Sequence, residues 1–106
     1  MRRTRQRVLV VFKAGPTWGS GPPEDQPGWE AHGDFVDALI AAGTFVMGGP
    51  FSDYSGSVNL LEGVTAKEAE ALLQDDPFVQ NGVFVVDSIR DWTVYVDELS
   101  ATKESA

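Results

Sequence analysis

The chain has 106 residues with no cysteine and a single histidine, so it suits one domain with one core and excludes disulfides, thiolate catalysis and histidine-rich metal sites. Its formal charge is −8, and because four of its eight basic residues lie in the first seven positions, the other positions carry four basic and 16 acidic residues, a net −12. Such an acidic body repels phosphate backbones, so we do not expect a nucleic-acid partner.

The first seven residues include four arginines and precede the first predicted strand. We expect residues 1–7 to form a short solubilising arm, residues 8–97 to form the domain and residues 98–106 to form a frayed tail. The apolar stretches fall well short of the ~18 residues that a membrane span needs, and no signal-peptide cleavage site follows the arm. The sequence therefore predicts a cytoplasmic protein without a membrane segment.

The first predicted strand, Val8–Lys13, is apolar and β-branched, which suits a strand covered on both faces. The next 14 residues, Gly15–Gly28, contain four glycines and four prolines, a composition that predicts a long loop. Loops of this length in compact domains are often functional. Two interpretations stay open: a lid whose Trp18 contacts a ligand, or a mobile surface loop.

The helix predicted over Trp29–Ala42 places the histidine on its apolar face. His32 lies three residues after Trp29 and four before Val36, which is helical spacing, and Gly43 is placed to end the helix. A lone histidine in such a stripe is ordinarily a hydrogen-bonded packing residue. Imidazole is also the side chain that most readily exchanges a proton near neutral pH, so the spacing alone leaves both roles open.

The second half of the chain predicts strands, turns and one more helix. We expect a strand over 44–47, a tight turn at 48–50, a second turn over 51–56 and a strand over 57–63. Thr65 and Glu68 fit a capping box that begins the second helix. Residues 76–82 are expected to form a short turn that packs Phe78 inward. A last strand runs from 83 towards 92, and residues 93–96 either continue it or form a fifth strand.

The predicted order βαββαβ is typical of ferredoxin-like α+β folds, which have a four-stranded antiparallel sheet with both helices on one face. The other face of such a sheet needs a cover. In a chain this small, the same sheet of a second copy is the expected cover, so we predict a homodimer.

A carboxylate partner would orient the histidine for proton transfer. Asp76, held next to the rigid Pro77 after the second helix, is the most interesting candidate, although an Asp-Pro pair is also a common turn signal. Arg90 is the one arginine beyond the first seven residues, and it could hold a substrate carboxylate or pair with a neighbouring surface aspartate. The acidic residues form no recognisable ligand loop, so no metal site is predicted.

The order of these motifs resembles the YciI-like, or YCII-related, family. The matching features, spread over roughly residues 8–96, are His32 on its helix, Gly49-Pro50 after the second strand, the helix start at Thr65–Glu68, and Asp76-Pro77-Phe78 followed by Gly82-Val83. The resemblance implies a ferredoxin-like fold that dimerises through its sheets into an α/β barrel. It also implies a His32–Asp76 pair in a pocket. A related branch includes a dehydrochlorinase acting on chlorinated hydroxyhydroquinone, and the fold is similar to that of muconolactone isomerases.

This resemblance favours an enzyme without a cofactor. In this hypothesis His32, oriented by Asp76, moves a proton next to a carbonyl or phenol of a small cyclic substrate and promotes isomerisation or elimination. The residues expected to bind the substrate are Trp18, Trp29, Gly49, Pro50, Phe78 and Arg90. The alternative is a non-catalytic small-molecule-binding or accessory protein that uses the same pocket.

Overall fold

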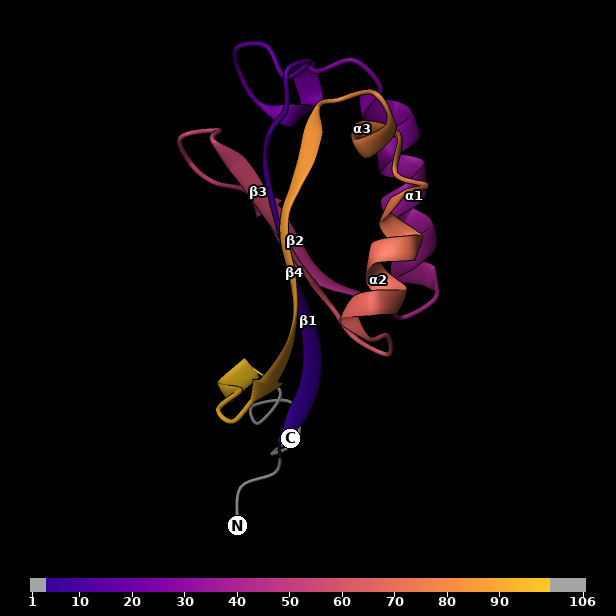
Figure 1. Cartoon of the computed structure of the whole chain (residues 1–106), viewed down its shortest axis with the longest axis vertical. Coiled ribbons are helices and arrows are strands. Elements are labelled where there is room, and N and C mark those ends of the chain that lie inside the picture. The colour runs from indigo at the N-terminus through magenta and orange to yellow at the C-terminus, as the bar shows by residue number, and fades with distance from the viewer. Residues whose placement is uncertain (1–3, 100–106) are drawn as a thin grey trace.

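Four strands form one antiparallel sheet whose helices lie on one face, as Figure 1 shows for the computed structural model, which describes residues 4–99. The elements in chain order are β1 (Arg5–Ala14), the 3-10 helix η1 (Pro23–Asp25), α1 (Trp29–Ala41), β2 (Phe45–Pro50), β3 (Gly56–Leu61), α2 (Ala66–Leu73), α3 (Pro77–Gln80) and β4 (Phe84–Val94). The strand order is β2-β3-β1-β4, and each neighbouring pair is antiparallel. The predicted ferredoxin-like α+β fold is confirmed.

The core lies between the sheet and the helices. Side chains alternate between the two faces of a strand, and in the central strand β1 the inward positions Val8, Val10 and Phe12 are fully buried. Leu73 of α2 and Phe78 of α3 are fully buried against the same cluster. A fully buried leucine or phenylalanine contributes about 1.5–3 kcal/mol of transfer free energy, so this layer holds the helices on the sheet.

The first strand begins earlier than the sequence predicted, at Arg5 instead of Val8. Arg5 pairs with Val94 of β4, and the Arg7 guanidinium is buried and lies 2.7 Å from the carboxylate of Glu62. Residues 5–7 therefore belong to β1 and not to an arm, because they pair with β4. The ion pair balances the charge of the buried Arg7. Residues 1–3 of the predicted arm and 100–106 of the predicted tail lie outside the described residues. Residues up to Val94 continue β4, and within 4–99 no fifth strand forms.

The predicted tight turn at 48–50 is wrong, because these residues are the second half of β2. Gly49 pairs with Val58 of β3, and proline is tolerated there because β2 is an edge strand. A Cβ at position 48 would lie 2.7 Å from the Asn59 Oδ1 atom. Glycine is therefore required at 48 for a close approach between strands. The chain instead reverses over 51–56, where Tyr54 has a φ of 59°.

The long loop before α1 is held by its own buried side chains. Gln26 is buried, donates hydrogen bonds from Nε2 to two carbonyl groups of the loop, and accepts one at Oε1 from the Gly19 N–H group. The Trp18 indole N–H group donates to the carbonyl group of Gly21, and its ring packs 5.8 Å from the Phe84 ring. Trp18 is 8% exposed and belongs to the core cluster. The loop thus closes one end of the core.

The predicted helix signals are confirmed at α2, and the predicted turn over 76–82 contains a helix. Thr65 is the N-cap of α2, with both hydrogen bonds of the capping box to Glu68 present. Residues Pro77–Gln80 form α3 with Asp76 as N-cap, because proline is pre-organised for the first helical position. Among the described residues, no helix is long and apolar enough to cross a membrane.

Replacing the cap of α2 should measurably destabilise the domain. Thr65→Ala removes the side-chain oxygen that accepts from the Glu68 N–H group, so we expect the free energy of unfolding to fall by about 1 kcal/mol. Urea denaturation at a fixed protein concentration measures this change. Lys67→Ala, at an exposed position of the same helix, is the control and should stay within about 0.5 kcal/mol of the wild type. Equal losses in both variants would contradict the capping role.

Candidate functional site

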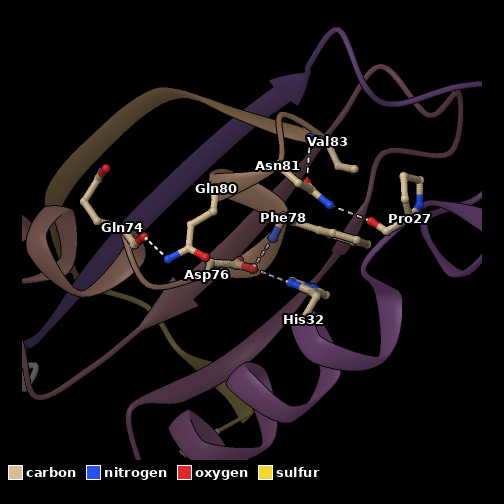
Figure 2. Close-up of polar contacts among 8 residues, drawn as sticks. All are labelled: Pro27, His32, Gln74, Asp76, Phe78, Gln80, Asn81 and Val83. Atoms are coloured by element: carbon tan, nitrogen blue, oxygen red, sulfur yellow. Dashed lines mark hydrogen bonds and ion pairs between the residues drawn. The ribbon is translucent and has the colours of Figure 1, made fainter.

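Two side chains that lie 44 residues apart in the sequence meet between α1 and α3 (Figure 2). The Nδ1 atom of His32, on α1, lies 2.8 Å from the Oδ1 atom of Asp76, the residue that precedes α3. The side chain of His32 is 11% exposed and that of Asp76 is 1% exposed. A hydrogen bond sheltered from water to this degree is electrostatically stronger than one at the surface.

The short helix α3 holds Asp76 in place. The Oδ1 atom of Asp76 accepts a 2.9 Å hydrogen bond from the backbone N–H group of Phe78, which caps the helix. The same oxygen faces His32, so the capping bond also sets the direction of the carboxylate. The other oxygen, Oδ2, is buried and has no hydrogen-bond partner among the described residues. The carboxyl group of Asp76 is thus fixed through one oxygen, and that oxygen lies beside the imidazole.

A second hydrogen bond ties α3 to the start of α1. The Asn81 amide, just after α3, donates from Nδ2 to the carbonyl group of Pro27 at 2.7 Å, as drawn in Figure 2. Gly28 follows with a φ of 90°, and a Cβ there would lie 2.7 Å from the same Nδ2 atom. His32 is one helical turn further on, and its backbone N–H group donates a hydrogen bond to the carbonyl group of Gly28. This junction brings His32 to Asp76.

Aromatic rings surround the imidazole on the inner side. Phe78 stacks on it with ring centroids 4.1 Å apart and planes 10° apart. Phe84 meets it edge-on at 5.4 Å, and Trp29 lies 5.9 Å away on the same helix. The stacking fixes the ring plane, so rotation of His32 would break both this contact and the hydrogen bond to Asp76.

His32 also lines a cavity of about 610 Å³ between α1 and the sheet. The cavity has walls from α1 and η1, from β2 and β3, and from the start of β4. The residues that line it include Glu24, Trp29, His32, Asp37, Gly48, Gly49, Pro50, Ser57, Asn59 and Phe84. Cavities of 300–1,000 Å³ are the usual size for small-molecule sites. The imidazole therefore stands between a buried carboxylate and a space that fits a small molecule.

The structure brings six of the eight predicted site residues to this place. Trp29, His32, Gly49 and Pro50 line the cavity, whereas Asp76 and Phe78 contact His32 directly.

The other two predicted site residues lie elsewhere. Trp18 is a core residue outside the cavity lining, because its indole packs on Phe84 and plugs the end of the core. Arg90 pairs with Leu9 across β4 and β1, one position away from the inward-facing Val10 and Ile89 pair. Because side chains alternate along a strand, Arg90 is on the sheet face that points away from the cavity. Arg90 cannot hold a substrate in this cavity.

Strand β3 contributes polar residues to the cavity that were not predicted from the sequence. Ser57 and Asn59 pair with Phe12 and Val10 of β1, so they share the inward face with Leu61. Ser57 donates a hydrogen bond to the carbonyl group of Gly49 at 2.9 Å. The sequence does contain a pattern that predicts them. Because side chains alternate along a strand, an inward Leu61 places positions 59 and 57 on the inward face as well. Two polar residues on the core face of a strand are a sign of a site.

The charged residues that line the cavity, apart from titratable His32, are the acidic Glu24 and Asp37. No lysine or arginine within residues 4–99 is part of the lining. In the nearby 51–56 turn, hydrogen bonds from the Ser55 hydroxyl and backbone amide hold the pKa of the exposed Asp53 carboxyl below its usual range. Among the described residues, no group of three or more His, Asp or Glu side chains is placed to bind a metal ion.

Comparison with known protein families matches residues 5–93 to the model of the YCII-related domain. Searches among curated proteins and among solved structures returned no match. The matched segment runs from the first residue of β1 to the penultimate residue of β4 and includes both His32 and Asp76. The chain therefore belongs to the YCII-related family.

Proposed function

We propose that the protein is an enzyme that transfers a proton on a small cyclic carbonyl or phenolic substrate, with His32 as the acid–base residue and Asp76 as its positioning residue. The observation that carries the proposal is the 2.8 Å contact between Nδ1 of His32 and Oδ1 of Asp76 at the wall of a cavity. A packing histidine needs a hydrogen-bond partner but has no need of a cavity beside it.

The hydrogen bonds of the pair determine which ring nitrogen is free. An ionised carboxylate only accepts hydrogen bonds, and Oδ1 of Asp76 already accepts one from the Phe78 N–H group. With Asp76 ionised, Nδ1 of His32 therefore carries the ring proton and donates a hydrogen bond to Oδ1. In the neutral ring Nε2 then has a free lone pair, and no described residue makes a hydrogen bond to it.

Nε2 of His32 is thus the base of the proposed reaction. It takes a proton from the carbon next to a carbonyl group, and the electron pair of that C–H bond moves towards the carbonyl oxygen to form an enolate. Return of the proton at another carbon completes an isomerisation, whereas departure of a leaving group with its electron pair completes an elimination. Asp76 stabilises the imidazolium formed in between. A positioned base of this kind contributes about 10²–10⁴-fold to the rate.

We also propose that the protein is a homodimer that joins through the sheet face without helices. Figure 1 shows α1, α2 and α3 together on the other face. The outward positions of the paired strands are mostly apolar, and they include Leu9, Val11, Val58 and Leu60. Met47, 49% exposed, and Trp92, 44% exposed, extend this surface on the edge strands. A largely apolar surface of this kind, interrupted by polar residues such as Arg90, is expected to be covered.

The single histidine makes the proposed tautomer directly measurable. The ¹⁵N spectrum of the imidazole should show, for the neutral ring, a protonated Nδ1 and an unprotonated Nε2 that belong to His32 alone. Asp76→Ala should abolish this preference, because it removes the acceptor at Oδ1. Asp75→Ala removes the same charge from the exposed neighbouring residue and should leave the ring signals unchanged. A wild-type ring protonated at Nε2 would contradict the proposed base.

Proton transfer can be tested before the natural substrate is known. Cyclic ketones, lactones and hydroquinones are incubated with the protein in D₂O, and ¹H NMR follows deuterium uptake at carbon. We expect catalysed exchange with at least one of these compounds and a loss of about 10²-fold or more in His32→Gln. Asp76→Asn should also slow exchange, whereas Asp75→Asn should not. Exchange at the wild-type rate in His32→Gln would refute the proposal, and binding without exchange in the wild type would favour the non-catalytic alternative.

The dimer proposal predicts the effect of a charge on the outward sheet face. Val58→Lys places a lysine among apolar side chains and should shift the protein from dimer to monomer, because burying an unpaired charge is costly. Size-exclusion chromatography with light scattering measures the molar mass of the wild type and of the variant. Ala71→Lys adds the same charge on the exposed face of α2 and should remain dimeric. A monomeric wild type at micromolar concentration would contradict the proposal.

A further inference from the structure

Asn59 is a mostly buried residue whose side-chain amide makes no hydrogen bond within the described chain. It lies on β3, is 6% exposed and lines the cavity that contains His32. No hydrogen bond joins its side chain to another described residue. Its neighbour on the same face, Ser57, differs because its hydroxyl donates to the carbonyl group of Gly49. The side-chain oxygen and nitrogen of Asn59 still reach solvent through the cavity, since among the described residues only Oδ2 of Asp76 is fully buried without a partner. The Asn59 amide is therefore open to a ligand in the cavity.

The strand beside Asn59 leaves room for this amide. Position 48, which pairs with Asn59, is a glycine, and a Cβ there would lie 2.7 Å from Oδ1 and 2.6 Å from the Phe45 ring. Any larger residue at 48 would push the Asn59 side chain aside. The glycine thus keeps an unpaired amide at the cavity wall.

The charges around the cavity restrict the ligand that this amide can meet. Glu24 and Asp37 line the cavity, and buried Asp76 lies behind His32. The basic residues of the described chain lie elsewhere: Arg7 pairs with Glu62, for example, and Arg90 is on the outward sheet face. A carboxylate or phosphate would therefore enter an acidic, partly desolvated space without a lysine or arginine to pair with. A neutral ligand has no such cost.

We propose that Asn59 is a substrate-binding residue whose amide hydrogen-bonds a neutral carbonyl, amide or hydroxyl group, so that the site selects uncharged cyclic substrates over carboxylates and phosphates. This inference rests on the proposed function for the identity of the site, since it names the substrate class that His32 would act on. The amide contributes both a donor and an acceptor. It therefore matches a neutral polar group and offers no charge to balance an anion.

Two probes of nearly equal shape test the inference. 4-Hydroxybenzamide and 4-hydroxybenzoate differ in charge at one group, and their dissociation constants can be measured from the ring signals of His32 and the side-chain amide signals of Asn59. We expect the wild type to bind the benzamide about tenfold or more tightly than the benzoate. Asn59→Leu, which keeps the approximate shape and removes the amide, should weaken benzamide binding about tenfold and leave benzoate binding unchanged.

Two further measurements separate binding from structure. Gln74→Leu removes the same kind of amide from an exposed position outside the cavity lining, so it should change benzamide binding less than threefold. Asn59→Leu should not lower the melting temperature of the ligand-free protein, because the amide makes no hydrogen bond to another described residue. A lower melting temperature with unchanged benzamide binding would show a structural role and overturn the inference.

The wild-type result also separates this inference from the proposed function. Benzoate bound as tightly as benzamide, or neither probe bound at millimolar concentration, overturns the selection of neutral ligands even if deuterium exchange depends on His32. Conversely, a preference for benzamide that depends on Asn59, without any exchange, supports the inference for a binding protein and refutes the catalytic step.

Discussion

The hydrogen bond between His32 and Asp76 depends on two helix ends that meet. Asp76 caps α3 through the Phe78 N–H group, and the same oxygen faces the imidazole. The Asn81 amide holds Pro27 at the start of α1, so the turn that carries His32 is attached to the end of α3. Each contact is local to one junction, yet together they place a titratable ring between a buried carboxylate and a cavity. Loss of the junction would separate the pair even if both residues remained.

Much of the fold was predictable because its signals are local. The apolar strand at β1, the capping box at Thr65 and the glycine after α1 each act within a few residues, and the structure has all of them. Asp76 was predictable as a partner only through the order of motifs across the chain. Its position depends on α1 and α3 packing together, a contact between segments 44 residues apart that no local pattern reports.

The predictions failed where a residue type serves two purposes. Glycine and proline at 48–50 have the composition of a turn, but the edge strand uses Gly48 for a close approach to Asn59. A tryptophan in a loop rich in glycine and proline suggests a ligand contact, but Trp18 packs in the core beside Phe84. The sequence also predicted that Arg90 could hold an anionic group of the substrate. Its pairing with Leu9 instead places Arg90 on the outward face of the sheet. In each case the deciding contact lies in another element.

The register of β3 links the site to the proposed interface. Ser57, Asn59 and Leu61 pair with inward residues of β1, while Val58 and Leu60 pair with outward ones. A shift of one residue would turn Asn59 away from the cavity and bring apolar side chains into it, because the faces of a strand alternate. The same shift would put polar groups on the surface that we propose to be covered by a second copy. One strand register therefore specifies both the polarity of the cavity and the apolar outward face.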